Sequence, residues 1–393
     1  MDTIQRIEGI DYSIETNGLK MKTENEYGNE NEYNEVNKMP YHMKRFYSRD
    51  EIQEIKKHIE SYGVKKTDDM TALWVLSSSC IYLLCSLWMI TVQFHIGVVL
   101  FACSYTRLFM IFHDACHNGF FYYPKDNQKL GVWLQYFFIW SYDQWRNTHN
   151  DHHTVFGNKN EYDPALSVIT KAKYEGLGKR EKWLYRILRD PLLFFWLIPF
   201  YFIVNSWHHK SIKGVVGAYS KFVICWMVGG RLLWGVCLSM YIAMILGAVS
   251  FHLQHSINIG FLEASNHKNS YYMRNHALLG ASMLRIPRVL KWATLGIEYH
   301  HIHHFSTRVP SYKLRACHEA GDVKHMWRKV PYVGYIGALV NIFKVYFNEE
   351  NGRFEAFDEY KKVGEWIRSR IESMGWMKDI TNTLDVGVTV FSS

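Results

Sequence analysis

Uncharged stretches constrain the fold of this 393-residue chain more than any other feature of its sequence. Residues 70–106 include no Asp, Glu, Lys or Arg, and Arg107 is followed by five more uncharged residues. A helix needs about 20 apolar residues to cross a hydrocarbon core about 30 Å thick. The run is therefore long enough for two transmembrane helices, which we predict at about 71–92 and 95–112. Arg107 then lies near the end of its helix, where we expect its side chain to extend to the interface.

Two later stretches, about 191–207 and 232–251, are also apolar and uncharged. The charges spread over residues 256–299 exclude a further crossing there, and the apolar segment 131–140 would reach only about 15 Å as a helix. We therefore predict an all-α integral membrane protein with four transmembrane helices, arranged as two hairpins.

The polar composition at both ends of the chain indicates three regions. Residues 1–38 are rich in Asn and Glu and lack an apolar segment, which predicts a disordered tail. Residues 39–355 would form the membrane domain with its four spans. Residues 356–393 would form a C-terminal cytosolic tail.

A net charge of +8 could indicate a nucleic-acid partner, but the basic residues are placed differently. Many of them lie just before the first predicted span, where the positive-inside rule places them in the cytosol. We therefore expect no nucleic-acid partner. These residues are Lys44, Arg45, Arg49, Lys56, Lys57, Lys65 and Lys66.

Histidines gather in four short groups along the chain. An H-x-x-H-H spacing occurs in two of the groups, although it should arise by chance only roughly once in 8,000 windows. On a helix, residues three and four apart share one face, so each group can direct two or three imidazoles the same way. The groups are His113 and His117; His149, His152 and His153; His252 and His255; and His300, His301, His303 and His304.

The predicted crossings bring all four histidine groups to the same membrane face. Imidazole is the commonest protein ligand for transition metals, and this many imidazoles exceeds the four ligands of one structural zinc ion. Two ions with four or five nitrogens each would fit, and iron, zinc and copper all suit such ligands. We therefore predict a cytosolic helical cap that carries a histidine-rich dimetal site.

Three of these stretches resemble the three histidine boxes of the membrane fatty acid desaturases. They are Arg107–His117, Trp145–His153 and Gly296–His304. The third, with the segment 305–314 that follows it, is similar to omega-type acyl-lipid desaturases (delta-12/omega-6 or omega-3). The resemblance covers about residues 40–355.

This resemblance implies a non-haem di-iron enzyme that inserts a cis double bond into an acyl chain, using O₂ and two electrons. Zinc could substitute for the two iron ions. His301 would occupy a non-ligand position, and His252 is a candidate for holding a metal-bound water. The implied catalytic metal ligands are His113, His117, His149, His152, His153, His255, His300, His303 and His304.

The resemblance also implies the partners. The substrate would be an acyl lipid or acyl-CoA, and the electrons would come from a separate donor, cytochrome b5 or ferredoxin. We expect the protein in the endoplasmic reticulum, with its active site facing the cytosol.

Ligating imidazoles usually donate their second N–H to a carboxylate or carbonyl oxygen. Carboxylates near the histidine groups are therefore candidates for that role, without a means to choose among them. They are Asp114, Asp151, Glu161, Asp163 and Glu298.

Other functions are possible for a membrane protein with these histidines. A lipid hydroxylase, an acetylenase or a carotenoid ketolase could share the same scaffold. A zinc-dependent membrane lipid hydrolase would need only three protein ligands and an open position. A metal transporter should place its ligands near the bilayer midplane, between spans.

Overall fold

The computed structural model describes residues 46–65, 68–158, 161, 163, 168–207, 212–255, 270–321, 324–350 and 353–373. The tail predicted for residues 1–38 lies outside these residues, as does 374–393.

Three helices in the described part of the chain are long and apolar enough to cross a membrane. They are α4 (Asp69–Val92), α5 (Phe94–Cys116) and α12 (Gly230–His255). Their bounds agree with the spans predicted at about 71–92, 95–112 and 232–251. The Asp68 carboxylate accepts hydrogen bonds from the first backbone N–H groups of α4, which fixes where that helix begins.

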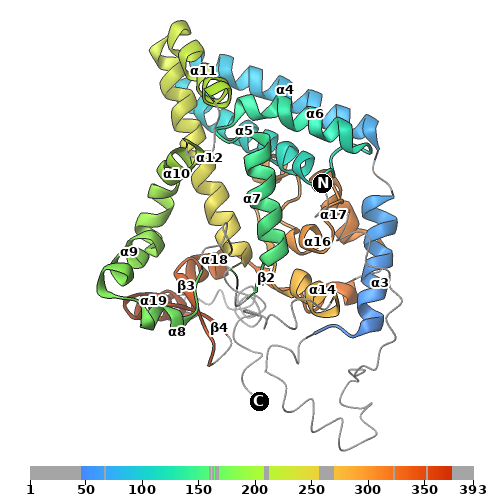
Figure 1. Ribbon diagram of the computed structural model, residues 1–393, viewed down its shortest axis with the longest axis vertical. Helices are drawn as coiled ribbons and strands as arrows, with labels where there is room; N and C mark the ends of the chain where they lie inside the picture. Colours follow the sequence, from blue (N-terminus) through green and yellow to red (C-terminus); the bar gives the residue numbers. More distant parts are fainter. Residues whose placement is uncertain are drawn as a thin grey trace, which may run out of the picture.

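Helices α4 and α5 run antiparallel and lie side by side at the top of the view in Figure 1. The turn between them is a single residue, Gln93. Close packing after this turn requires Gly97, because a Cβ there would overlap the backbone of Ile90. Helix α12 packs against the same pair, and its Ser239 hydroxyl donates to the Val98 carbonyl at 2.9 Å.

The fourth predicted span, about 191–207, coincides with α10 (Pro191–Trp207), which is shorter than the other three helices. It reaches a spanning length only together with α9 (Lys179–Arg189), from which it is bent by 86°. The bend falls at Asp190, because a residue before proline is pushed into the extended conformation that this residue adopts. Helix α11 (Ile212–Val228) connects this pair to α12.

Arg107 does not extend to the interface as predicted. Only 8% of the residue is exposed. Its Nε donates to the Ser79 hydroxyl at 2.9 Å, and its Nη1 donates to the Trp292 carbonyl at 2.5 Å. The guanidinium also lies over the Trp292 ring. Helix α15 (Arg288–Thr294) therefore covers the Arg107 side chain, which the sequence had predicted to extend to the membrane interface.

Shorter helices form a cap at the ends of α5 and α12 (Figure 1). A second hydrophobic core, which includes Ile55, Leu278, Ile302 and Leu314, packs several of them together. The cap helices are α3 (Arg49–Ile59), η2 (Glu60–Val64), α7 (Tyr142–Val155), α14 (Ser270–Leu279), α16 (His300–Phe305), α17 (Ser311–Glu319) and η4 (Lys324–Trp327). Helix α6 (Pro124–Leu134) instead packs against α5, and η3 (Gln135–Phe137) packs against α11.

Two small sheets amend the all-α prediction, although the chain is mostly helical. Strand β1 (Met283–Leu284) pairs in parallel with β2 (Tyr332–Val333), and β3 (Lys344–Asn348) pairs antiparallel with β4 (Arg353–Ala356). Strands of two residues are too short to show a period-two pattern in the sequence.

The region predicted as a C-terminal tail includes packed structure. The boundary predicted at residue 356 falls at the end of β4, and α19 (Asp358–Ser373) follows. The Tyr360 hydroxyl donates to the Asp190 carboxylate at 2.6 Å, which ties α19 to the bend before α10. Helices α8 (Lys171–Gly176) and α18 (Tyr335–Asn341) complete the described elements.

Candidate metal centre

Four helices bring the nine predicted ligands into one place. Helix α5 contributes the first pair from its last turn and the following residue, and α12 contributes its final residue. Helix α7 contributes three histidines, and α16 contributes three more. A sharp turn precedes α16, in which Gly296 has a φ of +100° that favours glycine.

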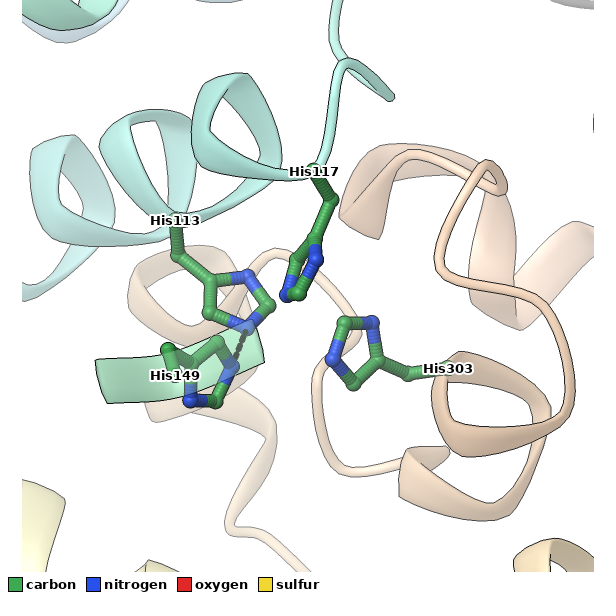
Figure 2. Close-up of side chains that lie close together, drawn as sticks. All are labelled: His113, His117, His149 and His303. Carbon is green, nitrogen blue, oxygen red and sulfur yellow. Dashed lines mark hydrogen bonds between the residues drawn. The ribbon is translucent and has the colours of Figure 1, made fainter. Parts of the chain in front are cut away.

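Four imidazoles form a first group: His113, His117, His149 and His303. Each offers one ring nitrogen, and these nitrogens all lie within 4.8 Å of one another. Figure 2 shows the four rings converging from three different segments of the chain. The closest pair, joined by the dashed line, is His113 Nε2 and His149 Nε2 at 2.9 Å. All four side chains are buried.

Three imidazoles form a second group: His152, His255 and His304, whose offered nitrogens also lie within 4.8 Å of one another. The remaining two predicted ligands join the groups. His300 Nε2 lies 3.0 Å from His255 Nε2 and 3.1 Å from His304 Nε2. His153 Nε2 lies 3.1 Å from His303 Nε2. The rings of His153 and His304 lie 4.3 Å apart between their centroids and link the two groups, so the nine rings form one continuous cluster.

The distances between these nitrogens suit metal ions. Two imidazole nitrogens bound about 2.1 Å from one ion at right angles lie about 3 Å apart, which matches the separations in the cluster. Among the described residues, the buried Nε2 atoms of His117 and His152 have no hydrogen-bond partner. A buried polar atom without a partner is costly, and an ion bound in each group would satisfy the atom there. The donor set therefore fits two metal ions.

Burial also keeps the rings in the form that binds metal. Desolvation lowers the pKa of the imidazoles well below the usual value, and the neighbouring imidazoles lower it further. Only a neutral imidazole offers a lone pair to an ion. This effect holds for His117, His149, His153, His300, His303 and His304.

Two of the five candidate carboxylates contact the ligand rings. An Asp114 oxygen lies 3.1 Å from His113 Nδ1, and an Asp163 oxygen lies 2.7 Å from His152 Nδ1. Each carboxylate thus accepts from the ring nitrogen that faces away from the centre. Two other candidates have different partners, since Glu298 accepts from Thr294 and Glu161 accepts from Asn158. Asp151 is exposed.

The two histidines of less certain role lie outside the cluster. His301 Nε2 is 3.2 Å from His318 Nδ1, and its ring meets the Trp327 ring edge-on. It therefore supports α16 from the side opposite the metal groups. His252 Nε2 is 3.3 Å from the Asn341 carbonyl, and its ring contacts Phe195. This contact with α18 does not support the suggested role for His252 in holding a metal-bound water.

The structure adds residues that the sequence did not single out. The Trp145 ring stacks on His149 at 5.5 Å, and the Phe156 ring contacts His152, His255 and His304. Trp145 could have been found, because it lies four residues before His149 and so on the same helix face. Ser311 donates to Asp114 from 197 residues away, a contact without a local sequence signal.

Aromatic side chains cover the cluster on the side of α5. Phe109 packs against Trp145 at 5.0 Å and against Phe138 at 5.5 Å, and Tyr105 contacts Phe138 at 5.1 Å. The side of the first group that faces α5 is therefore lined by aromatic rings.

Comparison with known proteins gives one consistent family. A family model described as fatty acid desaturase matches residues 86–335, a range that contains all nine clustered histidines. The chain is 30% identical over 275 residues to a fatty acid desaturase of Bacillus subtilis. The aligned region covers 66% of this chain and 76% of that protein.

Two further relatives have more specific names. The chain is 25% identical over 270 residues to an sn-1 oleoyl-lipid 12-desaturase of Picosynechococcus, covering 64% of this chain and 72% of that one. It is 26% identical over 236 residues to a chloroplastic sn-2 acyl-lipid omega-3 desaturase (ferredoxin) of Helianthus annuus, covering 54% and 52%.

Proposed function

The chain belongs to the fatty acid desaturase family, and from this premise we propose that it inserts a cis double bond into an acyl chain at a di-iron centre. It is an oxidoreductase that acts on fatty acyl lipids. The observation that carries the proposal is the convergence of nine imidazoles, most of them buried, beside aromatic side chains.

The nine clustered histidines would hold the two ions. His113, His117, His149 and His303 would bind the first, and His152, His255 and His304 would bind the second. Of the remaining two, His153 lies beside His303 and would complete the first coordination shell, and His300 lies beside His255 and His304 and would complete the second. Bound iron would supply redox chemistry with O₂, which zinc cannot.

The overall reaction balances with an external reductant. The acyl chain loses two hydrogens from adjacent carbons, and a separate carrier gives two electrons. O₂ takes up these hydrogens and electrons together with two protons and is reduced to two waters. The residues around the ions exclude bulk water and orient the chain, with Asp114 and Asp163 fixing two of the imidazoles. The Helianthus relative's name favours ferredoxin as the carrier, and cytochrome b5 is the other candidate.

We propose that the acyl group is carried by a membrane lipid, as the names of two relatives state for those proteins, with acyl-CoA as the other carrier. The same relatives are cyanobacterial and chloroplastic, and so do not favour the endoplasmic reticulum predicted from the sequence. We propose that the centre faces the side of the membrane on which the soluble electron carrier is found.

We propose four crossings, which the contacts of the centre support if α4, α5 and α12 each cross once. His152 on α7 contacts His255 at the end of α12, so both lie on one side of the membrane. The chain must then cross once more between Val155 and Gly230, and the bent pair α9–α10 supplies a spanning length there.

A glycosylation acceptor sequence inserted at Gly229 should lie on the opposite side from one inserted at Asn348. Glycosylation occurs on one side of the membrane, so we expect one of the two inserted sequences to be glycosylated. Glycosylation of both, or of neither, would contradict this topology.

The direct test is expression in a host that makes only saturated and monounsaturated lipids, followed by fatty acid profiling. We expect a new unsaturated species, absent when the His152→Ala variant is expressed at the same level in the membrane. A hydroxylated, acetylenic or keto product would instead select a related enzyme on this scaffold. Folded, metal-loaded protein that yields no new product would contradict the proposal.

A further inference from the structure

The carboxylate of Asp114 connects the first histidine stretch to the segment that follows the third. One oxygen, Oδ2, accepts the Ser311 backbone N–H at 2.6 Å, and the other, Oδ1, accepts the Ser311 hydroxyl at 2.7 Å. The same Oδ1 lies 3.1 Å from His113 Nδ1. All three residues are buried, with 1% of Ser311, 2% of Asp114 and 4% of His113 exposed.

This contact decides which nitrogen of His113 faces the centre. Both Asp114 oxygens accept hydrogen bonds from Ser311, so the carboxylate acts as an acceptor; His113 Nδ1 then donates to it and carries the ring proton. Nε2 then keeps its lone pair and faces His149 Nε2, at the first metal group. Asp114 can hold the ring in this orientation only if the carboxylate is itself held, and Ser311 supplies two of its three donors.

Ser311 also fixes the distance between two segments that contribute ligands to the same ion. It is the first residue of α17, six residues after the end of α16, which carries His303. Nearby contacts reinforce the junction. A Cβ on Gly119 would lie 2.7 Å from the Thr307 carbonyl oxygen, and the Tyr312 hydroxyl donates to the Phe120 carbonyl at 3.3 Å.

We propose that Ser311 is a positioning residue for the ion of the first group, acting through Asp114 on His113. The inference rests on the proposed metal centre and adds to it a residue outside the four histidine groups. The second group has its own carboxylate, Asp163 on His152. Loss of the Ser311 hydroxyl should therefore weaken the binding of the ion in the first group and leave the binding of the other ion unchanged.

The test measures metal retention, which does not depend on desaturation. Purified, iron-loaded protein in detergent is exposed to a chelator, and the release of each equivalent is followed. In Ser311→Ala, one equivalent should leave about tenfold faster than in the wild type, since loss of such an outer contact costs 10–100-fold in metal affinity. Ser311→Thr keeps the hydroxyl and should restore slow release.

A matched control separates this role from general destabilisation. Ser86 is also buried and donates to a carbonyl, that of Leu83, but it lies within α4 and away from the centre. Ser86→Ala should leave the release of both equivalents unchanged. The thermal midpoint of metal-free Ser311→Ala should lie close to that of metal-free Ser86→Ala.

Double variants assign the pathway, because residues that act through one another have non-additive effects. In the double variant with Asp114→Asn, Ser311→Ala should increase the rate of metal release little beyond that of Asp114→Asn alone. In the double variant with Asp163→Asn, the effects of the two substitutions on metal release should be additive. Equal acceleration of both equivalents, additivity with Asp114→Asn, or unchanged release in Ser311→Ala would overturn the inference while the proposed function stands. Wild-type protein that retains no metal would overturn both.

Discussion

Two histidines of α16 that are separated by one residue face opposite sides of the helix. His303 faces His113, His117 and His149 in the first metal group, whereas the His301 ring contacts His318 and Trp327 on the other side of the helix. The resemblance to the third histidine box implied this difference, since it gives His301 a non-ligand position. Helix geometry agrees, because His303 lies three residues from His300 and shares its face, whereas His301 is the adjacent residue and does not.

We expect His303→Ala to lose one metal equivalent and all desaturase product, since it removes one of the four imidazoles that we propose bind the first ion. The matched variant His301→Ala should keep both ions and cost on the order of 1–3 kcal/mol in stability, because it leaves His318 Nδ1 without its buried partner. Metal analysis and thermal unfolding of the two proteins make the comparison. Metal loss in His301→Ala but not in His303→Ala would reverse the assignment.

At the scale of single residues, the sequence identified the histidines that lie together better than it identified the carboxylates and hydroxyls that contact them. All nine predicted histidines meet, because each group lies on one face of a short helical segment. The division of these nine between two groups depends on tertiary contacts, and so does the choice of Asp114 and Asp163 over Glu298. Pairs such as Asp114 and Ser311 are too far apart in sequence to be inferred from spacing.

At the scale of helices, close approach of α4 and α5 depends on the absence of a side chain at Gly97. A Cβ there would overlap the Ile90 backbone, which cannot move aside as a side chain can. We expect Gly97→Ala to destabilise the protein by about 1–3 kcal/mol, the usual cost of overpacking. Gly247→Ala on α12 is the control, since its Cβ would meet nothing within 4 Å. Equal thermal midpoints for the two variants in detergent would contradict this account of the turn.

The helices themselves were predictable where their sequence is long and uncharged. The stretches at 71–92, 95–112 and 232–251 needed only length and hydropathy. The stretch at 191–207 was located correctly, but its 86° bend with α9 depends on Asp190, Pro191 and the contact with α19. Strands β1 and β2 pair across almost 50 residues and have no local pattern.

At the scale of the whole molecule, the buried imidazoles make folding depend on pH. Burial lowers the pKa of His318 to about 4, and it lowers the pKa of His149 and His303 well below the usual value near 6.5. Below pH 6.5 the unfolded chain therefore binds more protons than the folded protein, so folded stability falls as the pH decreases towards 4.

Thermal unfolding of the metal-free protein at pH 8, 7, 6 and 5 measures this dependence. We expect similar midpoints at pH 8 and 7 and a progressive decrease below. The metal-loaded protein should decrease more steeply, because protonated imidazoles release their ions. Midpoints that stay constant or rise towards pH 5 would show that these rings are not buried as neutral groups.

The central claim, that nine imidazoles hold two ions in one cluster, has a direct measurement. Anomalous X-ray scattering at the iron edge, from crystals of the iron-loaded protein, locates each ion without reference to activity. We predict two peaks, one among His113, His117, His149 and His303, and the other among His152, His255 and His304. A single peak, or peaks away from these rings, would contradict the account.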